Sequence, residues 1–169
     1  MNKPIVATVI GLVLSLIFGV TAQAADLRIG FVDAERINRE SAPAERATKK
    51  LEKEFAPREQ DLRKMEQQIK LIQGQLEKDG LTMSESDRRT KEQELGRQTR
   101  EFQRLQREFR EDLNLRRNEE LSALFERANK VIKQIAETEK YDLIIQEAVY
   151  RSTRIDITEK VIKALAADK

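Results

Sequence analysis

The feature that most constrains this chain is a repeat of apolar residues along two long stretches of charged sequence. The repeat alternates steps of three and four, the spacing that keeps one helix face against a partner helix. In the first stretch the nine positions of the repeat, seven of them apolar, are Thr48, Leu51, Phe55, Arg58, Leu62, Met65, Ile69, Ile72 and Leu76. In the second it comprises Leu95, Phe102, Leu105 and Phe109, then, after a shift of register through Leu113, Leu121, Leu124, Ala128, Val131 and Ile135. Such a shift relaxes a supercoil without ending the helix. We call these residues the seam.

A short segment with turn-forming residues separates the two stretches. Gly80 is predicted to end the first helix in the left-handed conformation, and Ser84 with Asp87 to cap the second. The chain therefore doubles back as an antiparallel helical hairpin, an arm over residues 43–139. Pro57 lies inside the first helix, where it removes one backbone hydrogen bond and should cause a bend. The bend could be a static kink or a hinge.

The first 24 residues have the pattern of an export signal. Lys3 supplies the positive start, an apolar run follows from residue 4 to residue 20, and Ala22-Gln23-Ala24 supplies small residues for cleavage. The competing interpretation is a membrane anchor, but the apolar run is at the lower limit for a span. We expect cleavage after Ala24 and a location outside the cytoplasm.

Composition narrows the class of protein. Charged residues make up 37% of the chain and aromatic residues 5%, which favours long solvated helices over a large globular core. The formal net charge of +2 argues against a dedicated nucleic-acid binder. Without His or Cys, the usual nucleophile–base pairs and most transition-metal sites cannot be built. We therefore expect no enzymatic activity, no cofactor and no metal site.

The two ends of the chain have a different pattern from the arm. Residues 27–33 alternate like a half-buried strand, residues 34–40 should form a short helix, and Ser41 should cap the arm. Residues 141–146 and 148–153 resemble two further strands, and Asp156 with Glu159 should cap a final helix. Residues 25–42 and 140–169 are thus predicted to form a β-rich body with one strand before the arm and two after it.

A sheet this small leaves exposed edges, which are liabilities in a free monomer. Joining bodies edge to edge would cover them, so we predict an obligate homo-oligomer. Six apolar residues are expected to form this oligomerisation body: Leu27, Ile29, Phe31, Leu143, Ile145 and Val149. The sequence pattern alone allows a dimer, a trimer or a tetramer.

At both ends, the residues resemble the Skp/OmpH family of periplasmic chaperones. The matching segments are Gly30-Phe31-Val32-Asp33, Tyr141 to Ile145, Val149-Tyr150 and Asp156 to Leu165, and the resemblance covers the whole mature chain. It implies an α+β, mostly helical fold: a homotrimer with a β-barrel body and three hairpin arms around a cavity. It also implies an ATP-independent holdase whose partners are unfolded outer-membrane β-barrel proteins.

A holdase needs many weak contacts and an adaptable surface. Leu71 lies off the seam, and Leu81 and Met83 lie at the tip, so these three are the predicted apolar client-binding residues. Phe102, Phe109 and Met65 are instead expected to pack one arm helix against the other.

Four arginines recur at steps of three, four and three on the face opposite the seam. This basic stripe comprises Arg97, Arg100, Arg104 and Arg107. It could attract acidic clients or the anionic head groups of envelope lipids. Alternatively it is a solvated face neutralised by Glu101, Glu108 and Glu111.

Two classes of function remain open from the sequence. One is a chaperone that holds unfolded clients, and the other is a structural coiled-coil spacer or adaptor of the cell envelope. A holdase should suppress aggregation of several unrelated denatured membrane proteins without ATP, whereas a spacer should not.

Overall fold

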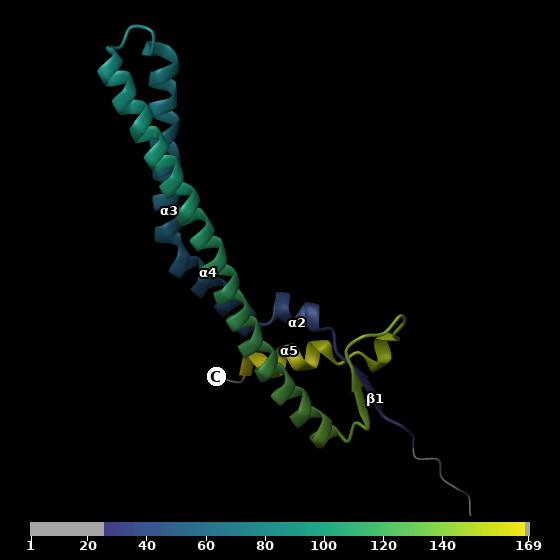
Figure 1. Cartoon of the computed structure of the whole chain (residues 1–169). Coiled ribbons are helices and arrows are strands. Elements are labelled where there is room, and N and C mark those ends of the chain that lie inside the picture. Colours follow the sequence, from purple (N-terminus) through teal and green to yellow (C-terminus); the bar gives the residue numbers. More distant parts are fainter. Residues whose placement is uncertain (1–25, 168–169) are drawn as a thin grey trace, which may run out of the picture.

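The computed structural model describes residues 26–167 and shows a long helical hairpin standing on a small mixed base (Figure 1). The predicted export signal lies outside the described residues. The elements in order are β1 Ile29–Phe31, α2 Ala34–Glu40, α3 Ala42–Asp79, α4 Glu85–Glu139, β2 Leu143–Ile145, the 3₁₀ turn η1 Thr153–Ile155, and α5 Thr158–Ala167. The α+β, mostly helical fold with a projecting hairpin is therefore confirmed.

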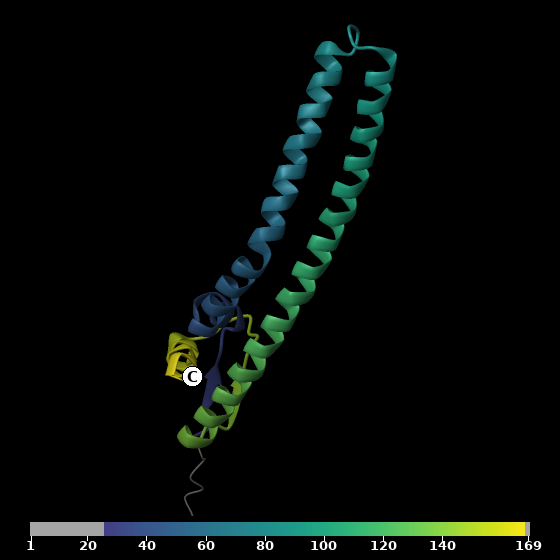
Figure 2. The same cartoon turned by 90° about the vertical axis from the view of Figure 1, so that its left-hand side faces the viewer.

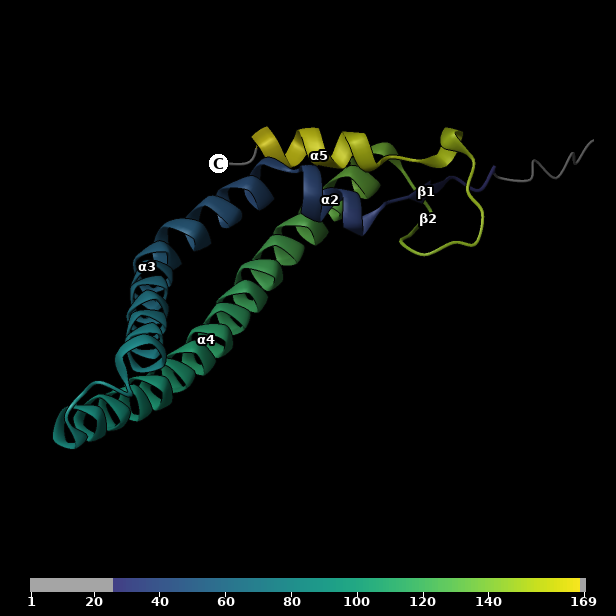
Figure 3. The same cartoon turned by 90° about the horizontal axis from the view of Figure 1, so that it is seen from above.

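The arm consists of α3 and α4, which run side by side to the tip (Figures 1 and 2). The helix α3 stays helical through Pro57 and bends part-way along its length (Figure 3). Pro57 cannot donate a backbone hydrogen bond, which is one physical cause of such a bend. A hinge about Pro57 stays a prediction.

The base contains the main apolar core of the described chain. Its seven buried residues come from the loop after β1, from α2, from the lower part of α4, from α5 and from the residue that precedes α5. They are Val32, Ile37, Ala128, Val131, Ile157, Val161 and Leu165. The lower end of α4 thus contributes to the base as well as to the arm. The arm is anchored in this core through α4.

The sheet has two strands in the described residues, not three. The strands β1 and β2 are parallel, with Ile29 opposite Leu143 and Phe31 opposite Ile145. The residues just before α5 lie along the other edge of β1, where the Ile157 amide donates to the Phe31 carbonyl at 2.9 Å. The predicted strand over residues 148–153 is therefore wrong for the single chain. Val149 is fully exposed, so that segment has no apolar surface to pack against.

Three of the predicted helix boundaries are confirmed. The helix α2 spans the predicted residues, and the Ser41 hydroxyl accepts from the Ala44 amide at 3.4 Å at the start of α3. At the start of α4, the Ser84 hydroxyl accepts from the Asp87 amide at 3.1 Å and donates to the Asp87 carboxylate at 2.7 Å.

One prediction about a helix end is wrong. Gly80 has φ −56°, because the tip continues with helix-like turns in which Thr82 and Met83 donate to the Asp79 carbonyl. Among the described residues the left-handed conformation occurs instead at Lys140, with φ 54°, where α4 ends.

The predicted capping box of α5 is only half formed. The Asp156 carboxylate accepts from the Thr158 amide at 2.9 Å. Glu159 does not return the bond, since the Asp156 amide donates to the Thr153 carbonyl. The Glu159 carboxylate pairs with Arg36 and Lys163 instead.

Candidate functional site

The two arm helices are held together by the seam. The Phe55 and Phe109 rings meet edge to face, with centroids 5.5 Å apart. The Arg58 guanidinium lies 5.6 Å from the Phe55 ring and 5.9 Å from the Phe109 ring, and pairs with Asp112 at 2.7 Å. Met65 and Phe102 are half-buried. Phe55 and Phe109 thus join the helices, as expected for Phe109.

Polar bridges reinforce this joint on both sides of the aromatic pair. Lys50 pairs with Glu120 at 2.5 Å near the base, and Arg116 reaches Glu54 at 3.1 Å. Near the tip, Lys91 donates to the Gln75 side chain at 2.7 Å. Exposed pairs of this kind each contribute well under about 1 kcal/mol. They restrict sliding of the helices more than they stabilise them.

Below the aromatic pair the helices separate enough to form a groove of ≈ 770 Å³. Its floor is largely apolar, with charged residues along its edges. The lining residues are Asn38, Ala47, Thr48, Leu51, Glu52, Phe55, Ala56, Glu59, Phe109, Leu113, Arg117, Glu120, Leu121 and Leu124. The groove is wide and open, which suits irregular apolar chains better than one small ligand.

The predicted client-binding residues differ in their exposure. Leu81 at the tip is fully exposed, and the Leu71 side chain, on the face of α3 away from the seam, is 65% exposed. Met83 is half-buried. Leu71 and Leu81 are therefore available to a partner along the outer half of the arm.

Sequence analysis missed two further exposed apolar residues on α4. Leu115 is 59% exposed and Phe125 is 39% exposed. Both lie off the seam after its shift of register, so the criterion that identified Leu71 would have identified them too. Together with Leu71 and Leu81, they place separate apolar groups from the base to the tip of the arm.

The basic stripe is only partly neutralised. The Arg104 guanidinium pairs with Glu101 at 2.5 Å and with Glu108 at 2.6 Å. These hydrogen bonds lower the pKa of the Glu101 carboxyl and raise the pKa of Arg104. Arg97, Arg100 and Arg107 are exposed and have no ion pair with any residue from 26 to 167. The stripe thus presents to solvent three guanidinium groups that form no ion pair with the described residues.

The predicted oligomerisation residues fall into three classes of exposure. Leu27, Leu143 and Val149 are exposed, and Ile29 and Ile145 are half-buried. Phe31 is buried, because the Arg151 guanidinium lies 4.2 Å above its ring. The exposed members and Tyr150 are the apolar side chains of the base that this single chain leaves uncovered; we call them the apolar surface at the base.

Comparison with known proteins identifies the family. The family model described as "Outer membrane protein (OmpH-like)" matches residues 28–165. The chain belongs to this OmpH-like family. Chaperone protein Skp of Pectobacterium atrosepticum is 32% identical over 165 residues, covering 96% of this chain and 98% of that protein. Chaperone protein Skp of Photorhabdus laumondii is 33% identical with the same coverage.

The OmpH-like fold is also found in a solved structure. A crystal structure described as an outer membrane chaperone (OmpH-like) from Caulobacter crescentus CB15 has a TM-score of 0.71 at 16% identity, covering 86% of this chain and 87% of that one. At this identity the likeness shows the fold alone. Within the part that the structure describes, no helix combines the length and apolar character needed to cross a lipid bilayer.

Proposed function

We propose that this OmpH-like protein is a periplasmic chaperone that holds unfolded outer-membrane β-barrel proteins without ATP. The observation that carries the proposal is the series of exposed apolar residues on an otherwise charged arm: Leu71, Leu81, Leu115 and Phe125. The shared name of the Skp relatives, chaperone protein, supports the same conclusion.

The chemistry of the clients fits such a surface. Strands of outer-membrane barrels alternate apolar and polar residues, so an unfolded chain offers many weak contacts and no single strong one. Burial of each exposed apolar side chain of the arm against a client could contribute on the order of 1–2 kcal/mol to the free energy of binding. Several such contacts retain a client, yet each one breaks easily.

The proposed assembly is a homotrimer whose bodies join through the apolar surface at the base. Its exposed residues Leu27, Leu143, Val149 and Tyr150 would be covered by neighbouring copies. Three arms would then enclose a common space for one client. The three arginines of the basic stripe that form no ion pair with the described residues would attract acidic segments of the client or anionic lipid head groups at a distance.

The proposal is tested by light scattering of a urea-denatured outer-membrane barrel protein diluted into buffer with the exported chain and no ATP. The client-face variant is Leu71→Gln, Leu81→Gln, Leu115→Gln and Phe125→Gln. Its matched control changes the exposed polar residues Gln67, Gln73, Asn114 and Ser122 to Ala. We expect the wild type and the control to suppress aggregation at near-stoichiometric ratios, and the client-face variant to need at least about tenfold more protein, because it loses four apolar contacts at once.

A wild type that leaves aggregation unchanged with several unrelated barrel clients would reject the holdase function and favour an envelope spacer. For the basic stripe, changing its four arginines to Gln should weaken client holding at low salt and reduce its salt dependence. Unchanged affinity and unchanged salt dependence would show that the stripe is only a solvated face.

A further inference from the structure

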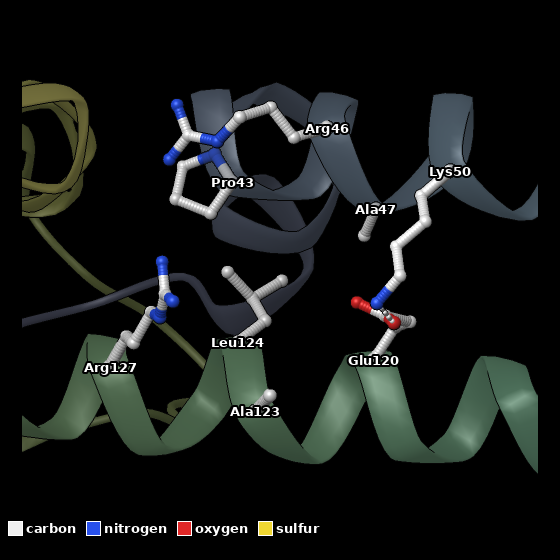
Figure 4. A pocket seen from close by; sticks show the side chains of 8 residues that line it. All are labelled: Pro43, Arg46, Ala47, Lys50, Glu120, Ala123, Leu124 and Arg127. Atoms are coloured by element: carbon white, nitrogen blue, oxygen red, sulfur yellow. Dashed lines mark hydrogen bonds and ion pairs between the residues drawn. The ribbon is translucent and has the colours of Figure 1, made fainter. Parts of the chain in front are cut away.

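A small pocket lies between the lower ends of the two arm helices, separate from the tip and from the basic stripe. Its volume is ≈ 180 Å³, and it is lined by Pro43, Arg46, Ala47 and Lys50 of α3 and by Glu120, Ala123, Leu124 and Arg127 of α4. Figure 4 shows the two arginine side chains at one end and the Lys50–Glu120 pair at the other. The short side chains of Pro43, Ala47 and Ala123 leave the space between them open.

The charges in this pocket do not balance. Lys50 and Glu120 neutralise each other at 2.5 Å. Arg46 and Arg127 have no ion pair with the described residues, so two positive charges remain at one end of the pocket. Two guanidinium groups on one small cavity repel each other unless an anion lies between them.

Neighbouring residues increase the excess of positive charge at the pocket. Lys130 and Lys133 line the adjoining surface together with Arg127, where Glu126 is the one acidic residue. Lys133 has a distant partner in Glu137, at 3.9 Å. The pocket also lies at the first turn of α3, and the positive end of a helix dipole favours an anion there. The local field therefore attracts negative charge.

We propose that this pocket binds a phosphate monoester group, with Arg46 and Arg127 as its two clamps. Guanidinium groups bind phosphate oxygens through paired N–H donors. A phosphate monoester carries about −1.5 to −2 charges at neutral pH, which matches two guanidinium groups better than a single carboxylate does. The cavity admits several atoms beyond one water molecule, enough for the phosphate and the start of the group that it is attached to. The source of the phosphate is either a soluble phosphate monoester, for which inorganic phosphate is the probe, or the terminal phosphate of an anionic lipid.

The test uses the full exported chain and two probes. The first is inorganic phosphate, titrated at constant ionic strength against chloride and followed by ³¹P NMR line width. The second is co-sedimentation with phosphatidylcholine vesicles that contain or lack phosphatidic acid. The pocket variant is Arg46→Gln with Arg127→Gln. The matched control, Arg110→Gln with Arg154→Gln, removes the same charge from two exposed positions that lie outside the pocket and outside the basic stripe.

We expect the wild type and the control to broaden the phosphate signal saturably, and the pocket variant to bind about tenfold more weakly. A parallel loss of sedimentation with phosphatidic acid vesicles assigns the phosphate to a lipid, whereas sedimentation unchanged by the pocket variant assigns it to a soluble phosphate. Circular dichroism checks that each variant keeps the helical content. If the double variant does not fold, Arg127→Lys, which keeps the charge but loses the paired donors, should still weaken binding severalfold.

Equal weakening in the pocket variant and the control would overturn the proposal, because it would mean that only net charge matters. Absence of saturable binding by the wild type to either probe would also overturn it. The pocket variant should suppress client aggregation as well as the wild type does. Failure of the phosphate proposal would therefore leave the proposed chaperone function intact.

Discussion

The base and the arm of this protein are stabilised in different ways. In the base, Val32, Val161 and Leu165 are completely buried, and contacts from α2, α4 and α5 converge on them. In the outer half of the arm, Ile69 and Ile72 are buried, while Leu71 between them is exposed. The base thus gains stability from a compact core, whereas the arm gains it from a narrow joint and leaves apolar side chains free. The exposed apolar side chains of the arm therefore stand on a base with a compact buried core.

The largest expected effect is on the base. Leu165→Ala should lower the free energy of unfolding by about 2–5 kcal/mol, because it removes a fully buried side chain and leaves a cavity. Leu81→Ala at the tip should change it by less than about 0.5 kcal/mol. Urea unfolding at one fixed protein concentration, followed by circular dichroism, measures both. Similar losses in the two variants would show that the base is not the stable part.

A smaller effect is expected from acid, again in the base. Burial alone would raise the pKa of the Asp156 carboxyl, but hydrogen bonds from Thr158 and Arg151 outweigh it and hold the pKa below its ordinary value of 3.8. A lowered folded pKa contributes stability above pH 3.8 that is lost as the pH falls through the folded pKa.

Asp156→Asn should therefore lower stability at pH 7 by about 1 kcal/mol, since solvent exposure of Arg151 weakens the pair. The variant should also flatten the acid dependence below pH 3.8. Thermal unfolding from pH 7 to pH 2 measures both effects. An unchanged acid profile would assign the acid sensitivity to other carboxylates.

The smallest effect is expected in the arm. Phe109→Leu keeps an apolar seam but removes the edge-to-face contact with Phe55, which contributes about 0.5–1.5 kcal/mol. Amide hydrogen exchange should become faster in α3 and α4 around this pair and stay unchanged in α5. Phe125→Leu, at an exposed position, is the matched control. It should leave amide exchange unchanged both in the arm helices and in α5. Equal acceleration in α5 would show that arm and base open together.

The arm was predictable because its determinants are local. The alternating steps of the seam, the Ser84 cap and the bounds of α2 follow from residues close together in the chain. The exposed Leu71 was found in the same way. Leu115 and Phe125 could have been found by the same criterion, because both are apolar residues that lie off the seam.

The base was less predictable because it joins the two ends of the chain. Residues 148–153 have the composition of a strand, yet no described strand lies beside them and Val149 is fully exposed. The position of Asp156 next to Phe31 likewise depends on distant residues. The left-handed residue is Lys140 rather than Gly80, since the exit from α4 must lead the chain back to β1.

The parallel pairing of β1 with β2 has a consequence for the order of folding. Arg28 and Asp142, which bond beside the paired strands, are 114 residues apart in the chain. Parallel neighbours need a crossover between them, and here the entire arm is that crossover. A loop of this length costs several kcal/mol of chain entropy to close while it is flexible, and far less once it is a rigid hairpin with adjacent ends. The helical hairpin should therefore fold first during synthesis. The paired strands and the core beneath them should form last, after the C-terminal residues have been made.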